Sequence, residues 1–284
     1  MEELFKLTGV KKTFLGFQPE FKDAKAVVIP VPYDSTTSYG VGTRFGPAAM
    51  IEASTQLELY DIELRKNICD DLPVYTLDEL QTDKGDPAKT VGIVRKAVSE
   101  VVKLGKKPVV FGGEHSISAG AVAAFGNDVS VLQIDAHADL RDSYEGTRNN
   151  HACAMRRIRD VTKHTVQVGV RSMCDEEADY ISKEKPAIFY GRDFDINKIV
   201  SQLGDRVYVT VDIDGLDPSI VPGTGTPEPG GLLWEDVLKI MKAVSKKEIV
   251  GFDVVEVLPT PPLRTSEFVA AKLAYKMMGY FWTR

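Results

Sequence analysis

The stretch Val129-Ser-Val-Leu-Gln-Ile-Asp-Ala-His-Ala-Asp139 decides the fold, because an apolar run ends there directly in a row of polar residues. Runs of the same kind recur along the chain. Their hydrophobicity is continuous, which predicts strands covered on both faces. The other five are Ala26 to Val31, Pro108 to Phe111, Val166 to Val170, Val207 to Ile213 and Ile249 to Val257. Together these runs indicate a buried sheet.

Helical patterns lie between the runs. Pro47 to Leu59 begins after a glycine, and proline suits the first helical position. Pro87 to Leu104 carries valines at spacings of three and four residues, which favours an amphipathic helix. Further helices are expected near Asp175 to Ser182, Trp234 to Val244 and Thr265 to Phe281. Alternating strands and helices predict an α/β fold of three layers (α/β/α), with a mainly parallel central sheet.

The composition is that of an ordinary globular protein, with 284 residues of which 43% are hydrophobic and 27% charged. Because no linker, charge block or repeat divides the chain, we expect residues 1–284 to form a single domain. The net charge of −6 argues against a nucleic-acid partner and favours a small cationic one. No apolar run is long enough for a membrane span and the start lacks a signal core, so a cytoplasmic protein with reduced cysteines is expected.

Polar motifs follow three of the apolar runs, at the carboxyl ends where parallel sheets form their sites. The first, Gly112-Gly113-Glu114-His115-Ser116, has two glycines that allow a tight turn just before its histidine, His115. In the second, Asp135, His137 and Asp139 stand at every second position. Alternate residues of an extended chain share a face, so we expect these three side chains to point the same way.

The third motif, Asp212-Ile213-Asp214-Gly215-Leu216-Asp217-Pro218, repeats this spacing in Asp212 and Asp214. The three motifs offer four carboxylates and two imidazoles, enough for two metal ions. Such a cluster would be strongly destabilised by repulsion and desolvation unless cations lay within it. Oxygen-rich ligands without thiolates favour Mn²⁺, with Fe, Co and Zn left open. Each motif alone could be a turn or a solvated loop, but three strand ends together favour a metal site.

Three further residues stand out. His151, in Asn149-Asn150-His151-Ala152-Cys153, follows a polar loop and could be a solvent-exposed histidine. Glu256 lies in an otherwise apolar run, where a buried carboxylate requires a partner. That partner would be either a protein cation or a cationic substrate. His164 belongs to no motif, and we interpret it as a structural residue at the start of a strand.

In this order, the motifs resemble those of the ureohydrolase family of arginases and agmatinases, from about Pro32 to Glu256. The family pattern is GG(D/E)HS, DAHxD, a loop with a histidine, DxDxxDP and a glutamate at a late strand end. The resemblance implies an arginase-like fold with two Mn²⁺ ions per chain. It implies one ion held by His115, Asp135, Asp139 and Asp212, and a second held by His137, Asp135, Asp212 and Asp214. Asp135 and Asp212 would then bridge the two ions.

The resemblance also implies that water activated by both ions hydrolyses a guanidino compound to urea and an amine. Glu256 would bind the guanidinium group of the substrate. Asp139 would carry a proton to the leaving amine, and His151 would exchange protons with solvent or assist the departure of the amine. Because relatives are commonly trimers or hexamers, a homo-oligomer is expected.

Within the family, Gly40 to Ala49 and Asp139 to Asp142 are similar to the agmatinase branch, which cleaves agmatine to putrescine and urea. Arginases tend to have asparagine where this chain has Arg141. Agmatinases, in turn, usually have Ser-His-Gly or Ser-His-Ala-Thr in place of Asn150-His151-Ala152-Cys153. Arginine, guanidinobutyrate, aminopropylagmatine and formiminoglutamate therefore remain alternative substrates.

Three other classes of protein fit these residues less well. A non-catalytic metal-binding member of the family would not need His151 and Glu256. A two-metal phosphoesterase would need donors such as Arg or Lys near its metals, and Glu256 would repel its anionic substrate. A deacetylase-like zinc enzyme would have one metal and fewer acidic ligands.

Overall fold

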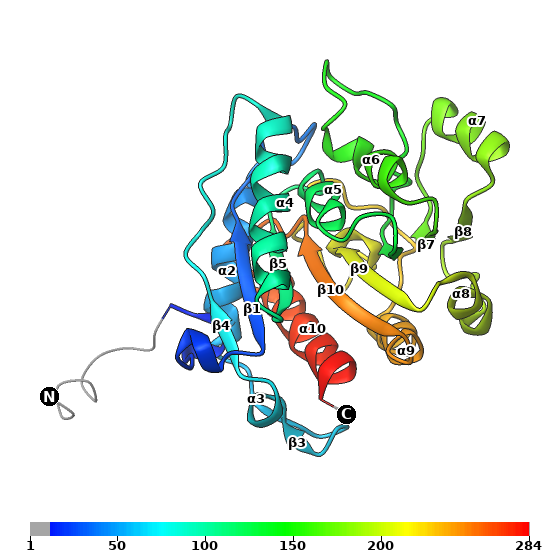
Figure 1. Ribbon diagram of the computed structural model, residues 1–284. Coiled ribbons are helices and arrows are strands. Elements are labelled where there is room, and N and C mark those ends of the chain that lie inside the picture. Colours follow the sequence, from blue (N-terminus) through cyan, green and yellow to red (C-terminus); the bar gives the residue numbers. More distant parts are fainter. Residues whose placement is uncertain (1–11, 284) are drawn as a thin grey trace, which may run out of the picture.

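The structure is a computed structural model that describes residues 12–283. Within these residues, one sheet contains eight strands in the order β4-β1-β5-β10-β9-β6-β7-β8, and every strand pair in it is parallel (Figure 1). The strands are β1 (Ala26–Val31), β4 (Val74–Thr76), β5 (Lys107–Gly112), β6 (Ser130–Ile134), β7 (Thr165–Val170), β8 (Ala187–Tyr190), β9 (Arg206–Asp212) and β10 (Glu248–Val255). A separate antiparallel pair is formed by β2 (Tyr60–Asp61) and β3 (Lys66–Asn67).

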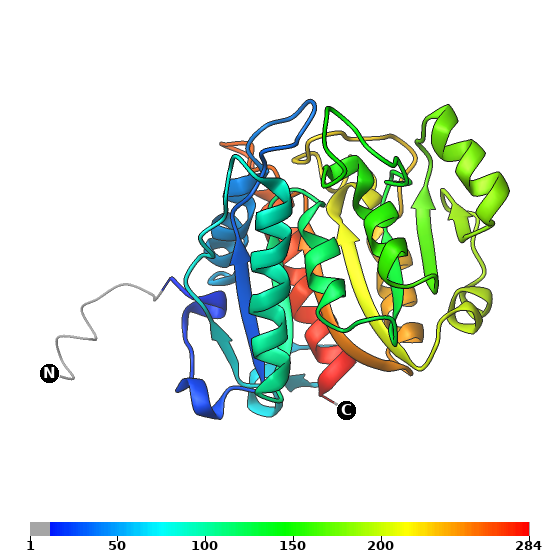
Figure 2. The same ribbon diagram turned by 45° about the horizontal axis from the view of Figure 1, so that its top comes forward.

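Helices cover both faces of the sheet (Figures 1 and 2). They are α2 (Gly46–Ser54), α3 (Ile68–Asp71), α4 (Pro87–Lys103), α5 (Ile117–Ala123), α6 (Ala154–Val161), α7 (Asp175–Glu184), α8 (Ile196–Gln202), α9 (Trp234–Val244) and α10 (Thr265–Trp282). Short 3₁₀ turns are η1 (Phe14–Gly16), η2 (Phe21–Asp23), η3 (Thr43–Phe45), η4 (His151–Cys153) and η5 (Ile213–Gly215). The helices α4, α5 and α6 lie on one face, and α2, α9 and α10 lie on the other.

The two faces of the sheet bury two separate hydrophobic cores. Successive side chains of a strand point to opposite faces, so Val28 of β1 enters the core with α2, α9 and α10, while Val27 and Ile29 enter the core with α4, α5 and α6. The side chains of Val27, Val28 and Ile29 are all fully buried. Both faces therefore require apolar residues, which explains the continuous hydrophobic runs. The predicted three-layer α/β/α fold is confirmed.

Each of the six predicted runs contains a strand, but some boundaries differ. β9 ends at Asp212 and β10 at Val255, so Glu256 follows its strand instead of lying within it. His164 directly precedes β7. The strands β4 and β8 were missed because they are only three and four residues long and form the two edges of the sheet.

The helix predictions differ from the structure in two ways. α2 ends at Ser54, well before Leu59. The helices α3, α5, α6 and α8 were not predicted, and each is between four and eight residues long. In α5 the residues Ile117–Val122 are all buried, so it shows no polar face that a periodic pattern could reveal.

Cys69, Cys153 and Cys174 are free thiols. Within residues 12–283, no helix combines the length and the apolar character that crossing a membrane requires.

Candidate metal centre

The site residues lie at or after the carboxyl ends of four strands that are direct neighbours in the middle of the sheet. The order β5-β10-β9-β6 brings together the segments that carry His115, Glu256, Asp212 and Asp135. Because all four strands are parallel, their carboxyl ends meet at one edge of the sheet. Residues from widely separated parts of the sequence therefore lie within contact distance of one another.

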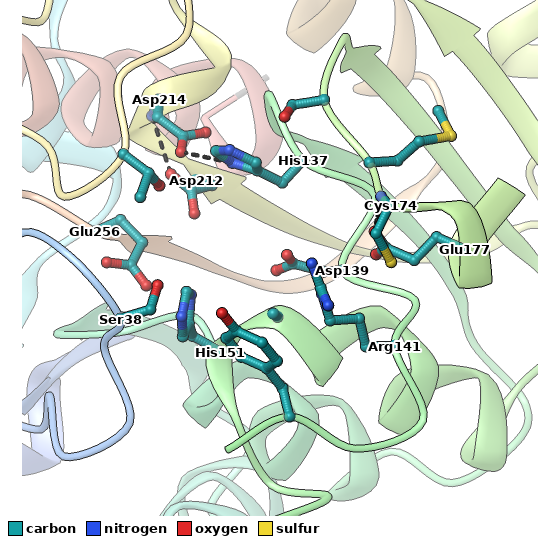
Figure 3. Close-up of a pocket in the computed structure, with 15 residues that line it drawn as sticks. Ser38, His137, Asp139, Arg141, His151, Cys174, Glu177, Asp212, Asp214 and Glu256 are labelled. Carbon is teal, nitrogen blue, oxygen red and sulfur yellow. Dashed lines mark hydrogen bonds and ion pairs between the residues drawn. The ribbon is translucent and has the colours of Figure 1, made fainter.

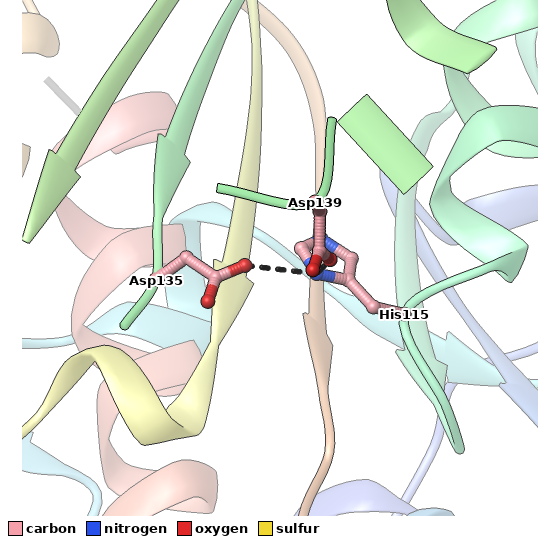
Figure 4. Close-up of side chains that lie close together, drawn as sticks. All are labelled: His115, Asp135 and Asp139. Carbon is pink, nitrogen blue, oxygen red and sulfur yellow. Dashed lines mark ion pairs between the residues drawn. The ribbon is translucent and has the colours of Figure 1, made fainter. Parts of the chain in front are cut away.

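The first cluster surrounds the imidazole of His115 (Figure 4). Its Nδ1 atom lies 3.1 Å from Oδ2 of Asp135, 3.0 Å from Oδ2 of Asp139 and 3.4 Å from Oδ2 of Asp212. The side chain of His115 is only 1% exposed, and Asp135 is fully buried. One nitrogen and three carboxylate oxygens thus converge on a small volume, and His115, Asp135 and Asp139 offer atoms close enough to hold one metal ion.

The second cluster uses the other histidine of the motif. Nδ1 of His137 lies 3.0 Å from Oδ2 of Asp214 and 3.7 Å from Oδ1 of Asp135. Asp135, His137 and Asp214 could hold a second ion, so Asp135 belongs to both clusters. The two carboxylate oxygens of Asp135 face different histidines, as a bridging ligand requires.

The prediction that alternate ligands share one face holds only in part. β6 ends at Ile134, and Asp139 has a φ of 52°, in the left-handed region, so the segment is not a regular strand. Asp135 and Asp139 approach His115, whereas His137 approaches Asp214. The ligands therefore divide between two neighbouring clusters instead of lining one surface.

Backbone donors hold the carboxylates in these orientations. Oδ1 of Asp212 accepts a hydrogen bond from the backbone N–H of Asp214 at 2.9 Å, and Oδ1 of Asp214 accepts one from Ala136 at 3.0 Å. Oδ1 of Asp135 accepts one from His137 at 2.6 Å. For Asp212 and Asp214, one oxygen is thereby fixed to the backbone while Oδ2 faces a histidine. The side chains are preorganised before any ligand binds.

The electrostatics of the cluster favour added positive charge. Burial alone would lower the pKa of His137, but Asp214 and Asp135 outweigh it and raise the pKa to about 12. Burial also opposes a charge on His115, yet Asp135, Asp139 and Asp212 raise its pKa well above the usual value. Burial, followed by the neighbouring Asp214 and Asp135, raises the pKa of Asp212. The site therefore takes up protons readily, and divalent cations would supply the same charge.

The donor set fits metal ions. Nδ1 of His115 is buried and has no hydrogen-bond partner among the described residues, although three carboxylate oxygens lie within 3.4 Å. A cation among these atoms would satisfy all of them at once. The clusters contain oxygen and imidazole nitrogen and no sulfur, which suits Mn²⁺.

Glu256 lies directly after β10, in a strained backbone conformation with a φ of 62°. Its Oε1 atom accepts a hydrogen bond of 2.7 Å from the backbone N–H of His115, and its own N–H donates to the carbonyl of Gly113 at 2.8 Å. Gly113 is required here, because a Cβ atom would lie 1.9 Å from the carbonyl oxygen of Tyr33. Burial, with the nearby charge of Glu114, raises the pKa of Glu256 well above its usual value. No ion pair joins Glu256 to a Lys, Arg or His side chain within residues 12–283.

His151 begins the 3₁₀ turn η4 and is partly buried, so it is not a solvent-exposed loop residue. Its backbone N–H donates to Oγ1 of Thr36 at 3.1 Å, and the side-chain amide of Asn150 donates to the carbonyl of Thr36 at 3.2 Å. These bonds tie the loop before η4 to the segment after β1. Burial, followed by the charges of His137 and His115, lowers the pKa of His151 to about 4.

These side chains border one cavity of about 230 Å³ (Figure 3). Its lining includes His137, Asp139, His151, Asp212, Asp214 and Glu256, whereas His115 and Asp135 lie deeper. Across the cavity from Glu256 are Glu177 and Cys174. Ser38, Tyr144 and Glu177 also line the cavity, and sequence reasoning missed them because they belong to loops and a helix without a distinctive pattern.

The chain is similar in sequence and in structure to known enzymes. The family model described as the arginase family matches residues 24–279. The chain is 41% identical to an N(1)-aminopropylagmatine ureohydrolase from Synechocystis sp., with 97% of this chain and 96% of that protein covered. It is 36% identical to an agmatinase from Pyrococcus horikoshii, with 92% and 93% covered. Among solved structures, it matches the agmatine ureohydrolase of Thermoplasma volcanium with a TM-score of 0.91 and 33% identity, covering 99% of this chain and 97% of that one.

Proposed function

Since the chain belongs to the arginase family and is a ureohydrolase acting on the C–N bonds of guanidino compounds, we propose that it cleaves agmatine to putrescine and urea. The observation that carries the guanidinium part of this proposal is Glu256, a buried carboxylate that faces the same cavity as the metal cluster. Within the described residues it forms no ion pair, which leaves it available to a cationic substrate.

We propose that two Mn²⁺ ions bind in the two clusters. His115, Asp135, Asp139 and Asp212 would hold one, and His137, Asp135, Asp212 and Asp214 would hold the other. When bound, the ions supply Lewis-acid activation of water for attack on the guanidinium carbon. The shared position of Asp135 supports its role as a bridge. Asp212 contacts the first cluster through Oδ2, and its role as the second bridge is part of the proposal.

Glu256 is proposed to bind and orient the guanidinium group. Its Oε1 atom already accepts the N–H of His115, so the carboxylate is held in one orientation and Oε2 remains for the substrate. The planar N–H donors of a guanidinium match a carboxylate well in geometry and charge. Fixing the group in this way would present its carbon to the attacking water and reduce the entropy lost in reaching the transition state.

Proton transfer is assigned to Asp139 and His151, which both line the cavity. The carboxylate of Asp139 would receive a proton from the attacking water and pass it to the leaving amine. Burial, followed by the charges of His137 and His115, lowers the pKa of His151 to about 4, so its neutral imidazole would hold a transferred proton weakly and release it readily to solvent or to the leaving amine. Nε2 of His151 has no hydrogen-bond partner among the described residues and remains available for that exchange.

Residues at the far end of the cavity would contact the tail of the substrate. Glu177 lies there, and its carboxylate would favour a substrate that is cationic at both ends, such as agmatine. A second candidate is N(1)-aminopropylagmatine, which the 41% identical relative favours. Arg141 also lines the cavity, with its guanidinium 4.4 Å from the ring centroid of Tyr144, and it would favour a tail with a carboxylate, such as that of guanidinobutyrate.

A single substrate panel tests the proposal. Protein loaded with Mn²⁺ is incubated with agmatine, N(1)-aminopropylagmatine, guanidinobutyrate and arginine, and the released urea is measured. We expect the highest kcat/KM with agmatine. A higher value with N(1)-aminopropylagmatine would establish the second candidate, and absence of urea with every compound would refute both. Asp135→Ala serves as the control for the metal site. If this variant releases urea at the rate of the wild type, the activity does not come from the proposed centre.

A further inference from the structure

Behind the proposed metal ligands, β9 carries a row of polar side chains. Tyr208, Thr210 and Asp212 stand at alternate positions, so they share one face of the strand. Asp212 is a proposed metal ligand, and Tyr208 and Thr210 lie fully buried below it. Thr210 is paired in register with Asp253 of the neighbouring strand β10, which is also fully buried.

Hydrogen bonds connect this row to His115. Nε2 of His115 lies 2.9 Å from Oγ1 of Thr210. The same hydroxyl donates to Oδ1 of Asp253 at 2.6 Å, and the hydroxyl of Tyr208 donates to Oδ2 of Asp253 at 2.9 Å. A buried carboxylate is costly unless donors reach it, and here hydroxyl groups reach both of its oxygens. The contacts form an unbroken chain from Asp253 through Thr210 to His115.

The protons available along this chain of hydrogen bonds determine which ring nitrogen of His115 carries the N–H. A hydroxyl has one proton. Oγ1 of Thr210 lies 2.6 Å from Oδ1 of Asp253 and 3.3 Å from Oγ of Ser118, so the proton goes to the shorter, charge-assisted bond with Asp253. The lone pairs of the Thr210 hydroxyl then face Nε2 of His115, so that nitrogen must carry the N–H. When a metal ion replaces the second proton, the imidazole is neutral and has only one N–H, so Nδ1 is left with a lone pair for the ion. The oxygens of Asp135, Asp139 and Asp212 surround Nδ1, so an ion bound by the lone pair would contact them as well.

We propose that Thr210 and Asp253 are positioning residues that fix the tautomer and the ring orientation of His115 for metal binding. The proposal rests on the assignment of His115 as a metal ligand under the proposed function. The two metal sites also differ in burial, because the side chain of His115 is 1% exposed whereas that of His137 is 25% exposed. The contacts through Thr210 support the buried site, so their loss weakens the ion bound by His115 more than the ion bound by His137.

The test compares two substitutions at one position. Thr210→Val removes the hydroxyl and keeps the shape, and Thr210→Ser keeps the hydroxyl. Thr90→Val is the matched control, since Thr90 is fully buried in α4 and, among residues 12–283, its hydroxyl bonds only to the backbone of Asp83. Bound Mn²⁺ is measured by equilibrium dialysis against increasing free Mn²⁺, without any assay of activity. Electron paramagnetic resonance then distinguishes an isolated Mn²⁺ ion from a coupled pair.

We expect Thr210→Val to bind one ion with roughly 10- to 100-fold lower affinity, the range typical for loss of a partner behind a metal ligand. At a Mn²⁺ concentration that fills both sites of the wild type, this variant would show the spectrum of an isolated ion. Thr210→Ser and Thr90→Val would keep two coupled ions. Asp253→Asn provides a second test, because it keeps an acceptor for Thr210 and should weaken the same site by a smaller factor.

Several results would overturn the proposal. Wild-type affinity at both sites of Thr210→Val would show that the hydroxyl does not act on His115. A Thr210→Ser variant as weak as Thr210→Val would show that packing is responsible, and equal weakening of both ions would remove the link to His115. If Thr210→Val does not fold, wild-type binding by Asp253→Asn would overturn the proposal instead. Failure of the proposed function is seen separately, since the wild type would then bind no metal pair or release no urea.

Discussion

Replacement of Glu256 by glutamine removes one charge and little else. The glutamine Oε1 atom can still accept the N–H of His115, which lies 2.7 Å from the glutamate Oε1 atom. What disappears is the negative charge that would pair with the guanidinium, and a charge-assisted hydrogen bond contributes about 1.5 to 3 kcal/mol. At about 1.4 kcal/mol per tenfold change, kcat/KM should fall by roughly ten- to a hundredfold or more with every guanidino substrate.

Stability is expected to change in the opposite sense, or not at all. Burial disfavours the charged form of Glu256 and raises its pKa well above the usual value, so a neutral side chain of the same shape is easier to bury. The Tm of Glu256→Gln should therefore equal or exceed that of the wild type, and its Mn²⁺ content should be unchanged. A glutamate with a purely structural role would behave differently, with a lower Tm and nearly normal catalysis per folded molecule.

The assay measures Tm, Mn²⁺ content and urea release on the same preparation. Glu267→Gln is a matched control, because Glu267 is 1% exposed in the first turn of α10 and does not line the cavity. A kcat/KM per metal-loaded Glu256→Gln molecule within about twofold of the wild type would refute the reasoning, since the loss of an ionic contact must exceed that.

The remaining predictions concern the metals and pH. Chelation should abolish urea release and added Mn²⁺ should restore it; full activity in protein shown by elemental analysis to be metal-free would contradict the mechanism. Asp135→Ala or Asp212→Ala should lose both ions together, and elemental analysis that finds two ions per chain would reject the bridging role of that residue. In metal-free protein, the pKa of His151 is about 4 when folded and about 6.5 when unfolded, so the unfolded chain binds a proton first as the pH falls. Stability from this residue is complete above about pH 6.5 and decreases toward pH 4, and Tm measured across that range should decrease less steeply in His151→Gln than in the wild type; parallel curves would reject this explanation.

The sequence alone determined the fold class and the chemical nature of the centre. Strands buried on both faces need continuous apolar residues, and the runs at Ala26 to Val31 and Val129 to Ile134 show them directly. Ligand types and their spacing are local properties as well, so the three motifs indicated a site rich in carboxylates and imidazoles. The family assignment followed from the same motifs and is supported by the comparisons. The single domain, the homo-oligomer and the cytoplasmic location stay predictions.

Only the tertiary structure decided how these residues combine. The order of strands places β10 between β5 and β9, and this brings Glu256 within 2.7 Å of the backbone of His115, 141 residues away. No local pattern encodes that neighbour relation, because it depends on which strands pair across the whole sheet. The ligands divide between His115 and His137 in a segment that has left the regular strand β6 and in which Asp139 has a positive φ, and regular alternation does not predict this. The support that Thr210 and Asp253 give to His115 likewise exists only through the pairing of β9 with β10, since a hydrogen bond requires atoms within about 3 Å whatever their distance along the chain.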